Sequence, residues 1–288
     1  MSRLDLGRVG IWAGEADRYP ARALRRAAAA VEDLGYRALW FPEATGREAM
    51  SQAALLLSAT RRTVVATGTA SIYARDAVSA AAAQRTLAEA FPGRFLLGLG
   101  VSHPVLVADV RGHRFGPPVA TMRAYLDGID AAPFGPPATA PPRVVAALGP
   151  KMIQLAGERS WGAHPLGMPV EHTRQARKLL GSQALLAVTQ LVVLEPSRSR
   201  AAELARAHAA AALPNRLTLL RDLGFDDAES LDDRLVEALV ATGDPDDVAR
   251  RVGEHLDAGA DHVSMHVITA TPDEPPSRQW EELAARLL

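Results

Sequence analysis

One pattern recurs along this chain and limits what it can fold into: an alanine-rich helical stretch, a glycine, and then a short apolar stretch. Its first instance is ALRRAAAAVEDLGYRALWF (residues 23–41), where apolar residues recur at helical spacing up to Gly35. The pattern returns around Pro92 and Gly93 and again before Gly259. Because glycine readily takes the left-handed conformation that ends a helix, each instance predicts a helix, a turn and a buried strand. Repeats of this unit are typical of α/β proteins with a parallel sheet.

The pattern and the stretches between its instances predict eight strands. They are residues 8–12, 36–41, 63–67, 143–148, 161–164 and 184–194, the run FLLGLG after Gly93 and the run HVSMHVI after Gly259. Helical stretches separate most of them over about 250 residues, the length typical of a (β/α)8 TIM barrel. A doubly wound open sheet has the same local pattern and stays open as the alternative. No linker or low-complexity tract divides the chain, so we expect a single domain over residues 1–288 and favour the barrel.

Composition argues against several classes of function. The formal net charge of −1 gives no basis for binding nucleic acid or an anionic membrane. The chain has no cysteine, which rules out disulfides and thiolate metal sites, and its eight histidines lack the spacing of metal ligands, so we expect no metal. It has neither an apolar run of about 18 residues nor the layout of a signal peptide. We therefore expect a cytoplasmic protein that acts on a small molecule.

The segment FLLGLGVSHP ends a predicted strand with Gly98, Leu99 and Gly100. A dinucleotide-binding fold would need a third glycine, a helix directly after it and an acidic residue about 20 positions later, and the sequence lacks these. The two glycines are small either because a barrel interior is crowded or because a cofactor lies against them. His103 stands just past the strand, where barrel enzymes place catalytic groups.

Two other strand exits are candidate binding sites. At Gly149–Met152 a glycine permits close approach of an anion, and proline at the first helical position loses no hydrogen bond. The amides of Lys151 and Met152 would point outward unpaired and favour an anion by about 0.3–1 kcal/mol when exposed. The alternative is that Gly-Pro simply starts a helix. The small polar stretch Gly68–Ile72 could let a flat ring approach the backbone or could be an ordinary loop.

Five stretches together resemble the luciferase-like monooxygenase superfamily, and within it the oxidoreductases that use the deazaflavin coenzyme F420. They are LGYRALWFPEA, VVATGTASIYARDAVSAAAAQRTLAEAFPGRFLLGLGVSH, RVVAALGPKMIQLAGERSWGAHP, PVEHTRQAR and DPDDVARRVGEHLDAGADHV. They occur in family order over most of the chain. The resemblance implies a (β/α)8 barrel that binds its cofactor at the C-terminal ends of the strands.

The resemblance also implies which residues hold the cofactor. In relatives a non-prolyl cis peptide bond follows the third strand and backs the deazaflavin ring, and here it matches the Ser71–Ile72 bond. A ribityl-contacting strand end and a phosphate-binding helix start have matches further along the chain. The implied cofactor-binding residues are Ala70, Ser71, Ile72, Gly100, Val101, Ser102, Gly149, Pro150, Lys151 and Met152. His164 follows the sixth predicted strand and is a further candidate, with a structural histidine as the alternative.

Two positions are implied to be catalytic. Glu43 corresponds to the acidic residue after the second strand, and His103 holds the position of a catalytic acid after the fourth. With an unperturbed pKa of about 6.5, a histidine there could serve as acid or base. The chain departs from the family at Ala44, where some deazaflavin dehydrogenases carry a catalytic histidine, which puts their sugar-phosphate chemistry in doubt.

The expected function is therefore hydride transfer between coenzyme F420 and a small organic substrate. Three alternatives stay open: an FMN-dependent monooxygenase of the same superfamily, a cofactor-binding barrel without turnover, and an unrelated barrel enzyme that acts on sugar phosphates. Relatives are often dimers, and the apolar helices would allow a homodimer here.

Overall fold

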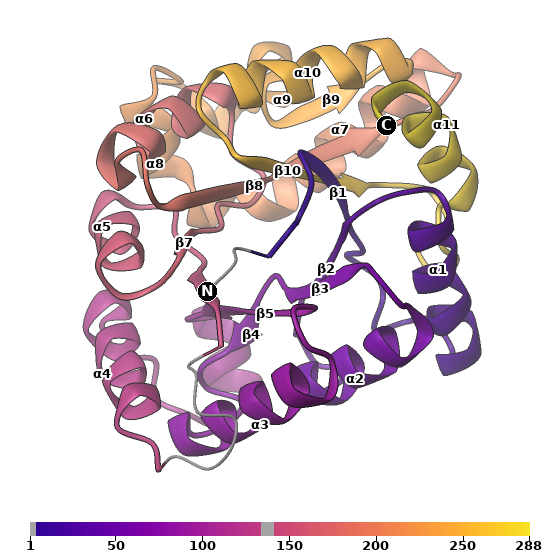
Figure 1. Ribbon diagram of the computed structural model, residues 1–288. Coiled ribbons are helices and arrows are strands. Elements are labelled where there is room, and N and C mark those ends of the chain that lie inside the picture. The colour runs from indigo at the N-terminus through magenta and orange to yellow at the C-terminus, as the bar shows by residue number, and fades with distance from the viewer. Residues whose placement is uncertain (1–3, 134–140) are drawn as a thin grey trace.

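The computed structural model describes residues 4–133 and 141–288 and shows a closed barrel of parallel strands (Figure 1). The strands of the ring are β1 Val9–Trp12, β2 Ala38–Phe41, β3 Val64–Thr67, β5 Phe95–Gly100, β6 Arg143–Val145, β7 Gly162–Ala163, β8 Leu185–Val193 and β10 His262–Val267. β10 pairs with β8 on one edge and with β1 on the other, which closes the ring. The predicted TIM barrel is thereby confirmed over the open sheet, and each of the predicted strands is present.

Helices surround the strands in Figure 1. The outer ring consists of α1 Ala21–Asp33, α2 Ala49–Ala59, α3 Ala77–Ala90, α4 Pro118–Asp130, α5 Pro150–Arg159, α6 Val170–Leu180, α10 Pro245–Asp257 and α11 Ser277–Leu287. A π-helical turn, Leu106–Val110, follows β5. None of the described helices is both long and apolar enough to cross a membrane.

The helix predicted before Gly259 is α10, and its two ends show what fixes it. The carboxylate of Asp244 accepts hydrogen bonds from the amides of Asp246 (2.9 Å) and Asp247 (3.0 Å), so it caps the first turn. Val248 and Val252 are buried against the barrel. Gly259, just beyond the helix, takes φ +105°, the left-handed conformation that lets the chain turn into β10.

Between β8 and α10 the chain forms an addition to the barrel that the repeated pattern does not predict. It contains α7 Arg198–Ala212, α8 Leu217–Asp222, α9 Asp233–Leu239, the 3-10 turns Leu213–Asn215 and Ala228–Ser230, and the short strand β9 Val240–Thr242. β9 pairs with the last residues of β8, and the helices pack against β8 in a second apolar cluster that includes Leu191, Leu220 and Leu239. The addition follows the C-terminal end of β8 and therefore lies at that end of the barrel.

Glu32, near the end of α1, joins the helix layer to the strands. Its carboxylate accepts hydrogen bonds from the amides of Arg61, Arg62 and Thr63, the residues that lead into β3. Burial alone would raise the pKa of Glu32, but these amides lower it to about 2. The charged carboxylate is therefore part of the folded structure.

Replacing Glu32 with alanine should lower the free energy of unfolding by about 1–3 kcal/mol, because buried amides lose their acceptor. Since its pKa falls from 4.5 to about 2 on folding, the contribution of Glu32 is complete above the higher value and is lost as the pH drops toward the lower one. Urea unfolding at neutral and acid pH measures both effects. Glu89→Ala, at an exposed position of α3, is the control, and an equal loss in both variants would contradict this role of Glu32.

Candidate active site

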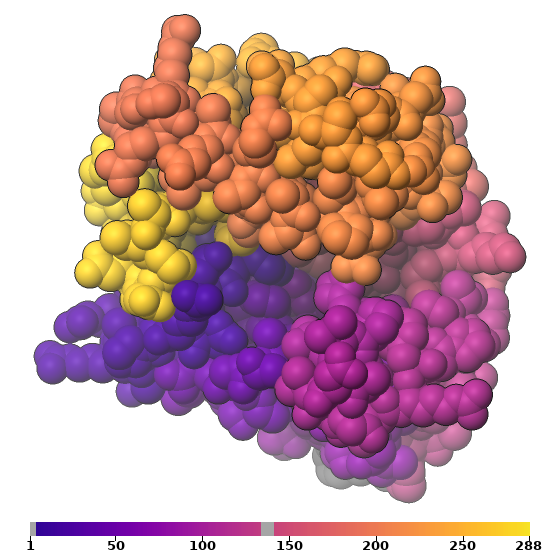
Figure 2. Space-filling model, turned by 180° about the vertical axis from the view of Figure 1, so that it is seen from behind, coloured from indigo at the N-terminus to yellow at the C-terminus, as the bar shows by residue number. Residues whose placement is uncertain are grey.

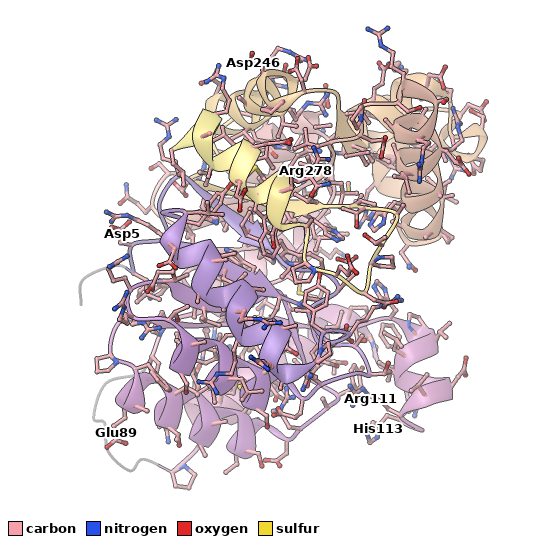
Figure 3. All side chains as sticks on the ribbon, turned by 90° about the vertical axis from the view of Figure 1, so that its right-hand side faces the viewer. Asp5, Glu89, Arg111, His113, Asp246 and Arg278 are labelled. Carbon is pink, nitrogen blue, oxygen red and sulfur yellow. The ribbon has the colours of Figure 1, made fainter. Side chains whose placement is uncertain are left out.

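The candidate site lies at the end of the barrel where the strands end. Figure 2 views this end, where the magenta segment after β5 and the orange segment after β8 both project. Figure 3 shows Arg111 and His113, from the segment after β5, on the opposite side of the molecule from Asp5 and Glu89. Because all strands of the ring are parallel, their C-terminal ends and the loops that follow them meet at this one rim.

The exit of β3 contains a non-prolyl cis peptide bond, but not at the predicted place. The cis bond joins Gly68 to Thr69, so the prediction of Ser71–Ile72 is wrong. Ala70–Ser71 instead form the short strand β4 beside the end of β5, and the amide of Ile72 donates to Gly100 O (3.0 Å). This pairing keeps the predicted stretch extended. Trp12, at the end of β1, fixes the cis unit by donating from Nε1 to Gly68 O (3.1 Å).

Glu43 holds the β3 exit in place. Its side chain is 2% exposed, and its carboxylate accepts from the amides of Ser71 (2.8 Å) and Ala49 (3.0 Å) and pairs with Arg75. Burial alone would lower the pKa of Arg75, but the carboxylates of Glu43 and Glu48 raise it above its usual value. Glu43 therefore positions the exit, and a direct part in proton transfer stays a prediction.

The end of β5 is crowded. At Gly98 this crowding, rather than contact with a cofactor, explains why the residue is glycine. A Cβ on Gly98 would collide with the carbonyl oxygen of Thr67 on β3, so the barrel itself requires a glycine there. A Cβ on Gly100 would likewise meet the hydroxyl of Thr69. Ser102 then takes φ +60°, and the chain turns outward to His103.

His103 is exposed on this rim, as its position after the strand predicts. Partial burial and the positive charge of Arg216 lower its pKa below the usual value. The imidazole is therefore neutral at neutral pH and is suited to accept a proton. Its catalytic role stays a prediction.

The predicted phosphate site at the start of α5 has most of the expected geometry. A Cβ on Gly149 would have no other atom within 4 Å, so the space in front of it is open. The amides of Gly149 and Lys151 have no acceptor among the described residues. The amide of Met152, however, donates to Gly149 O (3.1 Å) and is not available to an anion, which corrects the expectation for that residue.

His164 lies below the rim rather than on it. It is 1% exposed, stacks on Trp40 with ring centroids 4.3 Å apart, and donates from Nδ1 to Ala187 O (2.9 Å). Burial lowers its pKa to about 4, so the ring is neutral. Its Nε2 lies 3.0 Å from where a Cβ of Gly68 would stand, so it packs beneath the β3 exit; cofactor contact by His164 stays a prediction.

A polar cluster around His266 was not predicted. His266 Nε2 lies 3.1 Å from Glu15 Oε1, and its ring contacts those of Trp12 (centroids 4.7 Å apart) and His208 (5.2 Å apart). Burial would raise the pKa of Glu15, but His266 and His208 lower it overall. The sequence pattern could have revealed His266. A strand directs alternate residues into the barrel, and His266 is the last inward residue of β10.

A cavity of about 740 Å³ opens at the other end of the barrel. Its lining includes Leu6, Trp161 and His262, which stand at the N-terminal ends of strands. None of the predicted site residues lines it. Among the described residues no group of three or more histidines, aspartates or glutamates is arranged to hold a metal ion.

Comparison with known proteins identifies the family. The sequence model of the luciferase-like monooxygenase family matches residues 4–262. The chain belongs to this family. The family recognised from the sequence is thereby confirmed.

One curated relative is a Mycobacterium tuberculosis protein provisionally named a coenzyme F420-dependent oxidoreductase. It is 31% identical over 169 residues, which is 58% of this chain. The match spans 46% of that protein, less than half of its length.

Solved structures with the same fold include enzymes of two kinds. An F420-dependent secondary alcohol dehydrogenase with an F420–acetone adduct has a TM-score of 0.78 at 14% identity and 98% coverage of both chains. The coenzyme F420-dependent tetrahydromethanopterin reductase of Methanopyrus kandleri has a TM-score of 0.75 at 17% identity, covering 100% of this chain and 99% of its own. The oxygenating component of 3,6-diketocamphane monooxygenase from Pseudomonas putida, bound to FMN, has a TM-score of 0.72 at 15% identity and 98% coverage of both chains.

Replacing Glu43 with alanine should lower the free energy of unfolding by about 3–5 kcal/mol, because it leaves the buried guanidinium of Arg75 short of a partner. Glu48→Ala is the matched control. Glu48 also pairs with Arg75 but its side chain is 48% exposed and mainly caps α2, so the expected loss is about 1 kcal/mol. Urea unfolding measures both, and a loss in Glu43→Ala no larger than in Glu48→Ala would refute the positioning role.

Proposed function

We propose that this protein is an oxidoreductase that binds coenzyme F420 at the C-terminal rim and moves a hydride between the deazaflavin and a small organic substrate. The observation that carries the proposal is the adjacency of three strand exits. β3, β5 and β6 are consecutive neighbours in the ring, and the chain leaves them through Gly68–Thr69, Gly100–Ser102 and, four residues past the end of β6, Gly149–Lys151. Neighbouring strands lie about 4.8 Å apart, so an extended ring, ribityl chain and phosphate can follow the three exits in order.

The residues of these exits fit such a cofactor. At the β3 exit, Trp12 Nε1 donates to Gly68 O and holds the backbone of Gly68 and Thr69, against which a flat ring can pack. The amides of Gly149 and Lys151 have no described acceptor and can donate to a phosphate, and the space at the Cβ position of Gly149 is open. The named function of the Mycobacterium tuberculosis relative supports F420 as the cofactor.

The protein's own groups would place the substrate and handle its proton. When bound, the deazaflavin supplies the carbon that gives or takes the hydride, and the protein supplies placement and electrostatics. His103 on the rim and His266, oriented by Glu15, are the groups placed to accept or deliver a proton on the substrate. Glu43 acts through the backbone of the β3 exit that it holds.

An FMN-dependent monooxygenase is the second candidate, because FMN carries the same kind of ring, ribityl chain and phosphate. The FMN-bound monooxygenase with the same fold favours it. A barrel that binds a cofactor without turnover is a third reading, supported by Ala44 at a position where some relatives carry a catalytic histidine.

Fluorescence titration of the purified protein with F420 and with FMN separates the first two functions. We expect F420 to bind at least about tenfold more tightly, which corresponds to about 1.4 kcal/mol. Tight binding of FMN without binding of F420 would rule out the deazaflavin assignment. Oxygen consumption with reduced FMN would then establish the monooxygenase, and binding of F420 without its oxidation or reduction across alcohols, enones and imines would indicate a barrel without turnover.

The phosphate position has its own test at Gly149. Gly149→Asp fits the backbone, since φ −79° suits any residue and the Cβ meets no atom within 4 Å. Aspartate is also a good helix cap, so the fold should be at least as stable. Its charge should weaken F420 binding about tenfold or more by repelling the phosphate. Gly149→Asn, of the same size and neutral, is the control; equal affinities of the two variants would place the phosphate elsewhere.

A further inference from the structure

Arg216 is a buried arginine for which the described residues provide no carboxylate. It stands at the start of α8, in the addition after β8, and is 8% exposed. Its one described acceptor is Gly167 O, at 2.7 Å from Nη1. Four other arginines with little exposure are each paired with a carboxylate: Arg75 with Glu43, Arg143 with Asp130, Arg177 with Asp261 and Arg251 with Glu254.

A buried cation without a counter-ion is costly, and proteins normally avoid it. Burial lowers the pKa of Arg216 to about 10, so the guanidinium is still charged at neutral pH. One carbonyl oxygen satisfies one of its five N–H donors. The remaining donors of a fork of this shape are suited to the oxygens of a phosphate or carboxylate.

The surroundings place this charge at the rim. The amide of Gly167 donates to Thr189 O (2.8 Å), so the loop that receives Arg216 rests on β8. Gly167 takes φ +59°, and a Cβ on it would stand 3.0 Å from the guanidinium, so glycine lets Arg216 lie against the loop. Burial lowers the pKa of His103, of His172 and of His208, and the charge of Arg216 adds to the lowering in each case. These three histidines come from different segments around the barrel mouth.

His172 supplies a second unsatisfied group beside the start of α5. It is 4% exposed and donates from Nε2 to Leu148 O (2.7 Å), directly before Gly149. Its Nδ1 is buried without a partner in the described chain. Because Nε2 carries the proton, Nδ1 can accept a hydrogen bond from a ligand hydroxyl. A buried acceptor beside the start of α5 and buried donors on Arg216 thus remain unused at the same end of the barrel.

We propose that Arg216 binds an oxyanion, a phosphate or carboxylate carried by a molecule in the barrel mouth, and that His172 accepts a hydrogen bond from the same molecule. The anion can belong to the tail of the cofactor or to the substrate. Only this choice of source rests on the proposed function, since oxyanion binding at Arg216 can be measured without F420.

The direct test uses inorganic phosphate as the probe. At constant ionic strength, phosphate should raise the unfolding temperature of the wild-type protein relative to chloride. The increase should vanish in Arg216→Gln and be partly kept in Arg216→Lys, which retains the charge but loses the planar fork. Arg206→Gln, in the same addition and paired with Asp233, is the control and should keep the full increase.

No phosphate-dependent increase in the wild type, or the same increase in Arg216→Gln, would overturn the proposal. If Arg216→Gln does not fold, Arg216→Lys decides: an increase equal to that of the wild type would overturn it. The phosphate-dependent rise in unfolding temperature is the quantity to compare between variants. If Arg216 were purely structural, its replacement would change the unfolding temperature itself and leave the rise caused by phosphate unchanged.

The source of the anion is then found with F420 and with the same deazaflavin lacking its phosphate-bearing tail. If the cofactor supplies the anion, the wild type should prefer the tailed form at least tenfold and Arg216→Gln should lose that preference. If the substrate supplies it, Arg216→Gln should keep the wild-type preference for the tailed form, and the variant should raise KM for anionic substrates without a matching loss of kcat. Binding of neither form, with the phosphate increment present, would contradict the proposed function and leave the anion site standing.

Discussion

The pairing of β10 with both β8 and β1 is the constraint on which the rest of the molecule depends. It turns a row of parallel strands into a ring, so that Val263 stands opposite Val9 on one side and Val188 on the other. In a closed parallel ring every strand ends at the same rim. The closed ring therefore brings Gly68, Gly149 and His266 to one rim, although they are far apart in the sequence. Their loops need not contact one another.

Buried charges at the rim are of two kinds. At the β3 exit they are paired: Arg75 forms ion pairs with Glu43 and Glu48, and the Glu43 carboxylate also accepts hydrogen bonds from two backbone amides. Across the mouth, Arg216 has one carbonyl. A saturated network fixes geometry, whereas an unsaturated buried charge is a cost that a ligand can relieve. By this contrast, Glu43 and Arg75 fix the shape of the site, whereas Arg216 is available to bind a ligand.

Local interactions along the chain determine the helices and strands, and the sequence predicted these best. Helical spacing and glycine stops located the helices and strands, and the strand exits located the rim. The cis bond was misplaced by three residues, because backbone pairing between Ser71 and Gly100 is a long-range fact that no local pattern reveals. The family resemblance pointed to the correct strand exit, but not to the bond itself.

The importance of the groups that the sequence did not reveal depends on their neighbours in space. Arg216 belongs to an alanine-rich addition whose helices resemble those of the barrel. Only the packing shows that its guanidinium has no carboxylate partner among the described residues. His266 was considered for metal spacing along the chain, while its neighbours Glu15 and His208 arrive from other segments. Spacing along a strand says which face a residue is on but not what stands opposite.

A crystal structure of the protein grown with F420 tests the position of the cofactor most directly. We expect the deazaflavin ring against the backbone of Gly68 and Thr69 and the phosphate at the amides of Gly149 and Lys151. A cofactor bound instead in the cavity of about 740 Å³ at the N-terminal ends of the strands, beside Trp161 and His262, would contradict it.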